Sequence, residues 1–292
     1  MCQNLIYRVP FWFTVAVAAC WSMASHAFVV SVDEFSVTRN GVGFFTDSFT
    51  DGNPPPSAPN FLAGGGGGAA SYNVSGTIAG SAESGGRLLL DSANGALTAN
   101  ALEQARLTVN VRLLTNIDPA NLAAGLKNDD TLSLTGIFSL TTPSSSSGNA
   151  QYAIRFNDNS GAGAHQVLQL QVRLNPMTNA AEIRYLLQDF DANIIQILGT
   201  ASFAPPAGAD EILLNLSRPN IANDDFFASY SYLQAGAALG SGTFATPGQM
   251  FQGENFVRGE ITVSQGIVPE PATLAILALG LAGLGFSRRK KA

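Results

Sequence analysis

In the stretch Gln166-Val-Leu-Gln-Leu-Gln-Val-Arg-Leu-Asn175, apolar and polar side chains alternate from Leu168 to Asn175. Successive side chains of a β-strand point to opposite sides, so a period of two predicts a strand that buries one face. The apolar face would carry Leu168, Leu170, Val172 and Leu174, and the opposite face Gln169, Gln171 and Arg173.

The same alternation recurs in residues 105–115, ARLTVNVRLLT, which place Arg106, Asn110 and Arg112 opposite an apolar face. Turn signals such as Asn40-Gly41 separate the β-like runs. The further runs span 28–38, 43–50, 72–78, 87–91, 131–140, 151–157, 182–188, 194–198, 212–216, 226–233 and 256–263. Only residues 116–127, NIDPANLAAGLK, favour a short helix. The pattern predicts an all-β fold, with a single antiparallel β-sandwich over residues 28–266.

The end of this region has a recognisable order of elements. Residues 209–263 contain the run ADEILLNLSRP, an acidic loop, the run DFFASYSYL, a turn and a final strand. This order resembles the closing strands of concanavalin A-like and laminin-G-type jelly rolls. The resemblance implies a lectin-like sandwich and makes a glycan-binding module the alternative to a purely structural protein.

The C-terminal tail has three parts in fixed order: Val268-Pro269-Glu270-Pro271, the uncharged run 272–286, and Arg288-Arg289-Lys290-Lys291. The two prolines favour an extended, exposed backbone. As a helix the uncharged run would be about 22 Å long, against a hydrocarbon core of roughly 30 Å, so it would span only with thinning or snorkelling. We expect a C-terminal transmembrane helix with the cationic cluster on the cytoplasmic side. A buried core helix would show a polar face, which this run lacks.

Residues 267–292 as a whole resemble the PEP-CTERM protein-sorting signal of Gram-negative bacteria. The resemblance implies export, retention in the inner membrane through the C-terminus, and processing by an exosortase. It also implies a final location in the cell envelope or extracellular matrix, where such proteins accompany exopolysaccharide and biofilm.

The N-terminus has the features of a secretory signal peptide over residues 1–27. Arg8 supplies the positive region, residues 9–23 supply the apolar region, and Ser25-His26-Ala27 supplies small residues for cleavage after Ala27. Val17-Ala18-Ala19-Cys20 is a competing lipobox, in which Cys20 would become a lipidated N-terminus.

Composition limits the chemistry of the mature region. Both cysteines and both tryptophans precede Phe28, and His165 is the one histidine beyond it. Disulfides and a cysteine nucleophile are therefore excluded, and a zinc site is disfavoured. Between residues 28 and 268, ten cationic side chains stand against twenty acidic ones, a net charge of about −10. This charge argues against a nucleic-acid partner and favours a neutral or cation-bridged glycan over a polyanion.

No motif in the mature region predicts catalysis. It contains neither the Gly-x-Ser-x-Gly of a nucleophile elbow nor the carboxylate string of jelly-roll glucanases, and His165 is interpreted as a loop residue. We therefore expect a non-enzymatic structural protein without a cofactor, with a glycoside-active enzyme as the third candidate. Calcium is the one ion the loops 128–130, 189–193 and 223–225 suggest, although Asp and Asn also favour turns there.

The tail yields a first prediction. Replacing Glu270 by Ala should leave membrane insertion unchanged, because insertion depends on the apolar run and the cations. The variant should still accumulate unprocessed in the membrane fraction, as measured by immunoblotting of fractionated cells. Normal processing after all of Pro269, Glu270 and Pro271 are changed would contradict the sorting interpretation.

Overall fold

The alternating stretch 166–175 forms strand β10 (Gln166–Asn175) in the computed structural model. It pairs antiparallel with β9 (Ala150–Asn157) on one side and β11 (Ala180–Asp189) on the other. The structure describes residues 28–50, 70–75, 83, 85–92, 95–100, 103–115, 126–127, 130–143, 150–157, 165–175, 177–250 and 256–266. Residues Ala27–Ile267 form one compact unit.

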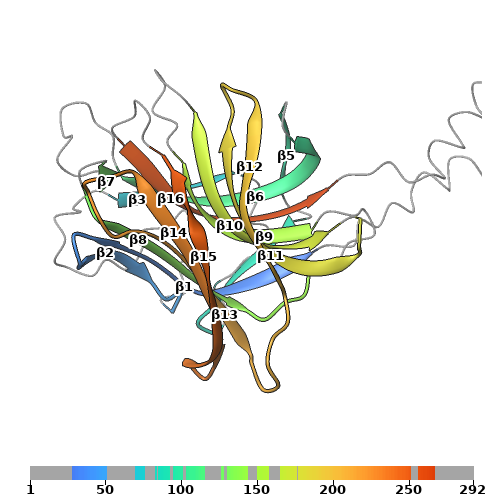
Figure 1. Ribbon diagram of the computed structural model, residues 1–292. Coiled ribbons are helices and arrows are strands. Elements are labelled where there is room, and N and C mark those ends of the chain that lie inside the picture. Colours follow the sequence, from blue (N-terminus) through green and yellow to red (C-terminus); the bar gives the residue numbers. More distant parts are fainter. Residues whose placement is uncertain are drawn as a thin grey trace, which may run out of the picture. The chain divides into compact units, whose positions relative to one another are not determined.

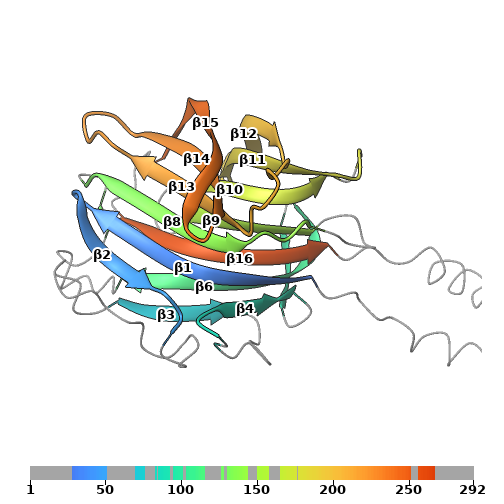
Figure 2. The ribbon, with the colours of Figure 1, turned by 90° about the horizontal axis from the view of Figure 1, so that it is seen from below.

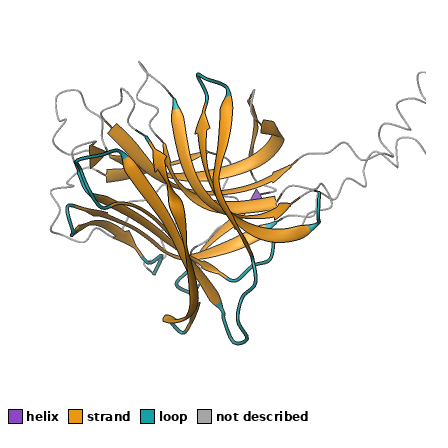
Figure 3. Ribbon diagram, viewed as in Figure 1, coloured by secondary structure: helices purple, strands orange, loops and turns teal. Residues whose placement is uncertain are grey.

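The described residues form antiparallel strands in two sheets (Figures 1 and 3). Besides β9, β10 and β11, the strands are β1 (Val29–Arg39), β2 (Val42–Asp47), β3 (Ala70–Ser75), β4 (Leu88–Asp91), β5 (Ala96–Asn100), β6 (Glu103–Thr115), β7 (Leu126–Lys127), β8 (Leu132–Ser139), β12 (Ile194–Ser202), β13 (Glu211–Arg218), β14 (Asp225–Gln234), β15 (Ala237–Gln249) and β16 (Phe256–Gly266). The seven-stranded sheet has the order β15-β14-β13-β8-β1-β2, with β4 beside β1. The nine-stranded sheet has the order β12-β11-β10-β9-β16-β6-β3, with β5 beside β6 and β7 beside β16.

The two sheets pack face to face through their apolar sides, and Figure 2 shows β1 and β16 in adjacent layers. Aromatic rings meet across the interface. Phe138 of β8 lies 5.0 Å from Tyr152 of β9, and Phe156 of β9 lies 5.3 Å from Phe226 of β14, both measured between ring centroids. The prediction of an all-β protein with antiparallel sheets in a sandwich is confirmed. The jelly-roll connectivity stays a prediction.

Tyr185 joins the two sheets by hydrogen bonds in the core. Its hydroxyl donates to the carbonyl of Phe226 at 2.8 Å and accepts the N–H of Gly248 at 3.0 Å. A Cβ at Gly248 would lie 2.6 Å from this hydroxyl and 2.4 Å from Leu168, so the close approach of β15 requires glycine. The sheets are therefore held by a polar contact as well as by apolar packing.

Two hairpins are closed by two-residue turns. Asn40 and Gly41 both have positive φ and connect β1 to β2 in a two-residue turn, as the Asn-Gly pair predicts. Ala235 and Gly236 do the same between β14 and β15. The turns fix the register of both hairpins.

Some expectations are corrected or lie outside the described residues. The helix expected over 116–127 is wrong at its end, because residues 126–127 form β7 and pair with β16. Strand β15 had no prediction at all. The signal helix, the helical run 272–286 and most of 116–127 lie outside the described residues. Within the described residues, the structure has no helix long and apolar enough to cross a membrane.

An acidic residue sits at an irregularity of β1. The pairing of β1 with β8 shifts between Val32 and Glu34, which leaves Asp33 in a bulge. Asp33 Oδ1 lies 2.9 Å from Nε of Arg87, and Nη2 of Arg87 lies 3.6 Å from Oε1 of Glu211. Burial, reinforced by a hydrogen bond with Glu211, raises the pKa of Asp33 from 3.8 to about 7, and the charge of Arg87 opposes this shift.

This carboxyl yields a pH prediction. Because the pKa of Asp33 is higher in the folded protein than its ordinary value, its stabilising contribution is complete in acid and is lost as the pH rises through about 7. Between about pH 5 and about pH 8, urea denaturation should therefore show a smaller fall in unfolding free energy for Asp33→Asn than for wild type.

Asp189→Asn is the control for this measurement. The N–H of Ala192 and the amide of Gln166 lower the pKa of Asp189, so its titration falls below this range and the slope should not change. Equal slopes for wild type and Asp33→Asn would contradict the assignment.

Candidate functional site

The outer face of the nine-stranded sheet, which points away from the other sheet, is polar and yet largely closed. Thr262 and Ser264 of β16 are 1% exposed, Gln169 and Gln171 of β10 are 2% exposed, and Asn110 of β6 is 3% exposed. An outward polar face of a sandwich is ordinarily solvated. Polar side chains that are buried on this outer face, away from the apolar core, indicate that the face forms a pocket.

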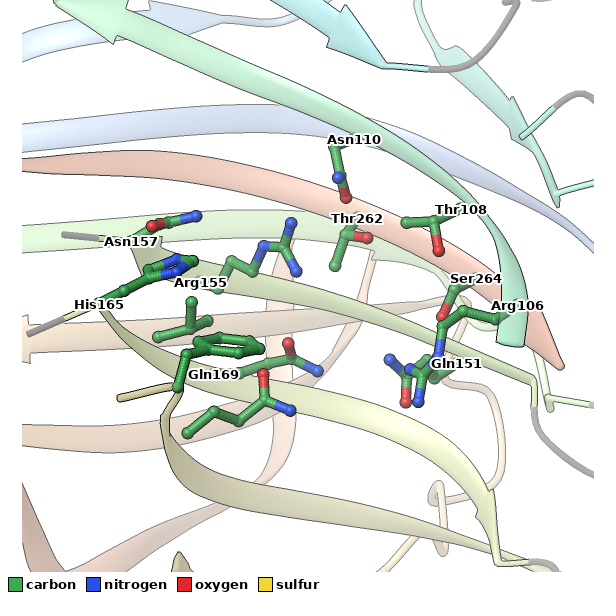
Figure 4. A pocket seen from close by; sticks show the side chains of 13 residues that line it. Arg106, Thr108, Asn110, Gln151, Arg155, Asn157, His165, Gln169, Thr262 and Ser264 are labelled. Carbon is green, nitrogen blue, oxygen red and sulfur yellow. The ribbon is translucent and has the colours of Figure 1, made fainter. Parts of the chain in front are cut away.

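The pocket has a volume of about 340 Å³ and crosses five neighbouring strand segments (Figure 4). Antiparallel register places its groups in rows, with Ser264 opposite Thr108 on β6 and Gln151 on β9. Thr262 lies opposite Asn110 in the next row. The pocket is lined by Arg106, Thr108, Asn110, Gln151, Arg155, Asn157, His165, Val167, Gln169, Gln188, Phe190, Thr262 and Ser264.

Glu260 of β16 organises one side of the pocket. Its side chain is fully buried, and Arg155 Nε donates to its Oε2. Asn157 Nδ2 donates to its Oε1 at 3.3 Å. A buried charge is stable only when it is paired and hydrogen-bonded. The pair therefore holds Arg155 and Asn157 in fixed positions, with the charge of Arg155 balanced.

Three lining residues present polar atoms that the protein does not satisfy. Among the described residues, Oδ1 of Asn110, Oγ of Ser264 and Nε2 of His165 are buried without a hydrogen-bond partner in the protein. Leaving such a group without a partner costs about 1–3 kcal/mol. These atoms are therefore available to a bound polar molecule.

His165 and Phe190 form a flat wall at one end. Their rings are stacked with centroids 4.5 Å apart, and the N–H of Phe190 donates to the carbonyl of His165 at 2.9 Å. Burial lowers the pKa of His165 from 6.5, with the nearby charge of Asp191 opposing the shift, so the imidazole is neutral at neutral pH. The sequence assigned His165 to a surface loop. The structure places it half-buried at the start of β10, in the pocket lining.

The lining suits a ligand rich in hydroxyl groups. Amides and hydroxyls both donate and accept hydrogen bonds, as sugar hydroxyls do. Phe190 adds an apolar surface against which a ring can lie. The thirteen lining residues include no carboxylate, so this pocket does not itself supply the pair of acids that glycoside hydrolysis uses.

The loops suggested for calcium carry internal hydrogen bonds where they are described. Asp130 pairs with Arg39 at 2.6 Å, Asp189 accepts the N–H of Ala192 at 2.8 Å, and Asp224 pairs with Arg218 at 3.0 Å. Within the described ranges, no group of three His, Cys, Asp or Glu residues is placed to hold a metal ion. Asn128 and Asp129 lie outside those ranges.

The other predicted site residues also lie outside the described part of the chain. They are the cleavage position Ala27, the motif Val268, Pro269, Glu270 and Pro271, the cationic cluster Arg288, Arg289, Lys290 and Lys291, and the alternative lipidation site Cys20.

The pocket itself was not predicted from the sequence. Arg106, Asn110 and Gln169 were assigned to polar strand faces, which is correct, but nothing marked those faces as a binding site. The available signal was composition, because these faces carry Gln, Asn, Thr and Ser where a solvated face usually carries Lys and Glu.

Comparison with known families identifies a sorting motif in the C-terminal tail. The family described as PEP-CTERM protein-sorting motif matches residues 268–290. The motif marks an exported protein whose C-terminal signal is recognised by exosortase and processed at the membrane. No curated protein and no solved structure matches the chain.

Two buried serines give a matched test of the pocket. Ser92 is fully buried, accepts the N–H of Phe28 at 3.0 Å and donates to Gln265 at 2.9 Å. Ser92→Ala should lower the unfolding free energy by about 1–3 kcal/mol, because it removes two buried hydrogen bonds. Ser264→Ala removes a hydroxyl that has no partner in the protein. It should change the unfolding free energy by less than about 0.5 kcal/mol, or raise it.

Chemical denaturation of both variants measures the difference. A loss at Ser264→Ala as large as that at Ser92→Ala would show that the Ser264 hydroxyl has a structural role and does not serve the pocket.

Proposed function

We propose that this exported protein is a non-enzymatic component of the cell envelope or extracellular matrix that holds polysaccharide in its β-sandwich domain. The sorting motif supports delivery to the outside of the inner membrane. The pocket supports the glycan-binding form of this role over a purely structural one. Exopolysaccharide or biofilm matrix is the natural setting for both.

The single observation behind the proposal is the set of partnerless polar atoms on the closed outer face. Asn110, Ser264 and His165 each hold one such atom, and all three line one cavity. A polar group kept buried and unsatisfied costs stability, so its retention indicates a use. Sugar hydroxyls supply the donors and acceptors that these atoms require.

The side chains that would bind the ligand lie on rigid elements. The lining side chains come mainly from β6, β9, β10 and β16, which pair in continuous register, and Glu260 fixes Arg155 and Asn157. A preorganised site loses little conformational entropy on binding. The neutral amides and hydroxyls then select a polyhydroxylated ligand over an apolar one.

A glycan array with the full chain purified in detergent tests this function. Wild type should bind a subset of oligosaccharides. Thr262→Val keeps the shape of the pocket side chain but removes its hydroxyl, and it should weaken binding about tenfold, which corresponds to one good hydrogen bond.

Thr243→Val on the exposed face of β15 is the matched control and should bind as wild type does. Absence of binding to every saccharide on the array would refute the proposed function.

A further inference from the structure

The two ends of the pocket differ in polarity. Two of its thirteen lining residues are apolar, Val167 and Phe190. Both belong to the same end, because Val167 pairs with Asn157 and Phe190 stacks on His165. Figure 4 shows Asn157 and His165 at the end opposite Gln151. The pocket therefore has one partly apolar end, at His165, and one polar end, at Gln151.

Strand register makes a compact block of the His165 end. The N–H of Phe190 donates to the carbonyl of His165, and Val167 lies two residues farther along β10. Residues two apart on a strand share a face, so the side chains of His165 and Val167 are neighbours. Gln188 of β11 lies opposite Val167. Four lining residues thus form a two-by-two block on the outer face.

Val167 differs from its neighbours in polarity. It is 2% exposed, and it points away from the apolar core because the next residue, Leu168, packs in that core. A valine offers no hydrogen bond to a sugar hydroxyl, but it gains favourable contact with a methyl group. The ring of Phe190 extends the same apolar surface. The His165 end therefore suits a small apolar substituent.

One unsatisfied polar atom belongs to this apolar end. Nε2 of His165 is buried without a hydrogen-bond partner in the protein. In the tautomer that carries its proton on Nε2, the neutral imidazole donates one hydrogen bond there. A single donor beside an apolar surface matches a group that has one carbonyl oxygen and one methyl.

We propose that the pocket takes a saccharide that carries an acetyl group, with the acetyl group seated at the His165 end. Its methyl contacts Val167 and the ring of Phe190, and its carbonyl oxygen accepts the proton of Nε2 of His165. The amides and hydroxyls toward the other end hold the sugar hydroxyls. This inference rests on the proposed function and specifies its ligand class. An acetyl group presents the same methyl and carbonyl oxygen on a sugar nitrogen as on a sugar oxygen.

An acetylated sugar of this kind is uncharged, which agrees with the charges of the site. Arg155, the lining arginine toward this end, is paired with Glu260. The surplus of acidic side chains in the domain would repel a polyanion but has no net attraction or repulsion for a neutral ligand. The preference for a neutral glycan, drawn from net charge, is therefore kept and made more specific.

The test compares pairs of neutral oligosaccharides that differ in acetylation. The full chain in detergent is titrated calorimetrically with chitohexaose and cellohexaose, which carry an acetamido or a hydroxyl group at the same carbon of each ring. The second pair is an O-acetylated xylo-oligosaccharide and its deacetylated form. At least one acetylated sugar should bind about tenfold or more tightly than its partner, the gain typical of a filled apolar subsite. The pair that shows this preference identifies whether nitrogen or oxygen carries the acetyl group.

Variants at the His165 end test the seat of the acetyl group. Val167→Thr replaces a methyl by a hydroxyl and should bring the two affinities of a pair to within about threefold of each other. His165→Leu should act in the same direction, whereas His165→Gln supplies an amide N–H in place of Nε2 and should restore part of the preference. Val42→Thr, at an exposed position of β2, is the matched control and should leave all affinities unchanged. Thermal melting shows whether each variant is folded.

Equal affinities within both pairs would overturn this inference while leaving the proposed function intact. An undiminished preference in both Val167→Thr and His165→Leu would overturn the seat assigned to the acetyl group. Absence of binding to these four sugars, when other saccharides on the glycan array bind, would overturn the inference alone. Absence of binding across the whole array would overturn both the inference and the proposed function.

Discussion

Strict alternation along the central strands is the constraint on which the rest of the structure depends. Each of β9, β10 and β16 packs one face against the other sheet and lines a closed polar pocket with the other. A slip of one residue would place glutamines in the core and leucines in the pocket. β10 accordingly pairs with β9 and β11 without a bulge, whereas in the same sheet the pairing of β11 with the edge strand β12 is irregular.

The same alternation explains which parts of the fold could be predicted from sequence. Residues 168–175 alternate without a break, and the strand predicted over 166–175 has those bounds in the structure. β15 reads AALGSGTFATPGQ, rich in Gly and with a proline, and local propensity favours turns there. It is a strand because the Ala235-Gly236 turn lays it along β14, which local sequence does not reveal. β7 is similar, since its two residues become a strand only by pairing with β16.

The pocket was beyond prediction because it depends on which strands are neighbours. β16 lies between β9 and β6, although β6 and β9 precede it by a hundred residues or more. Only this insertion brings Thr262 and Ser264 between Asn110 and Gln151, and brings Glu260 to Arg155. The sequence showed that each strand had a polar face. The strand order made these faces one surface.

The position of β16 also determines how the domain would carry a mechanical load. This last strand ends at Gly266, two residues before the sorting motif, and pairs with β9 along one edge and β6 along the other. A pull on the tail along the strand axis must shear both ladders together, because antiparallel hydrogen bonds run perpendicular to the strands. An edge strand would peel away one bond at a time. A domain that binds polysaccharide on this same sheet while its tail is held would therefore resist tension through both hydrogen-bond ladders of β16.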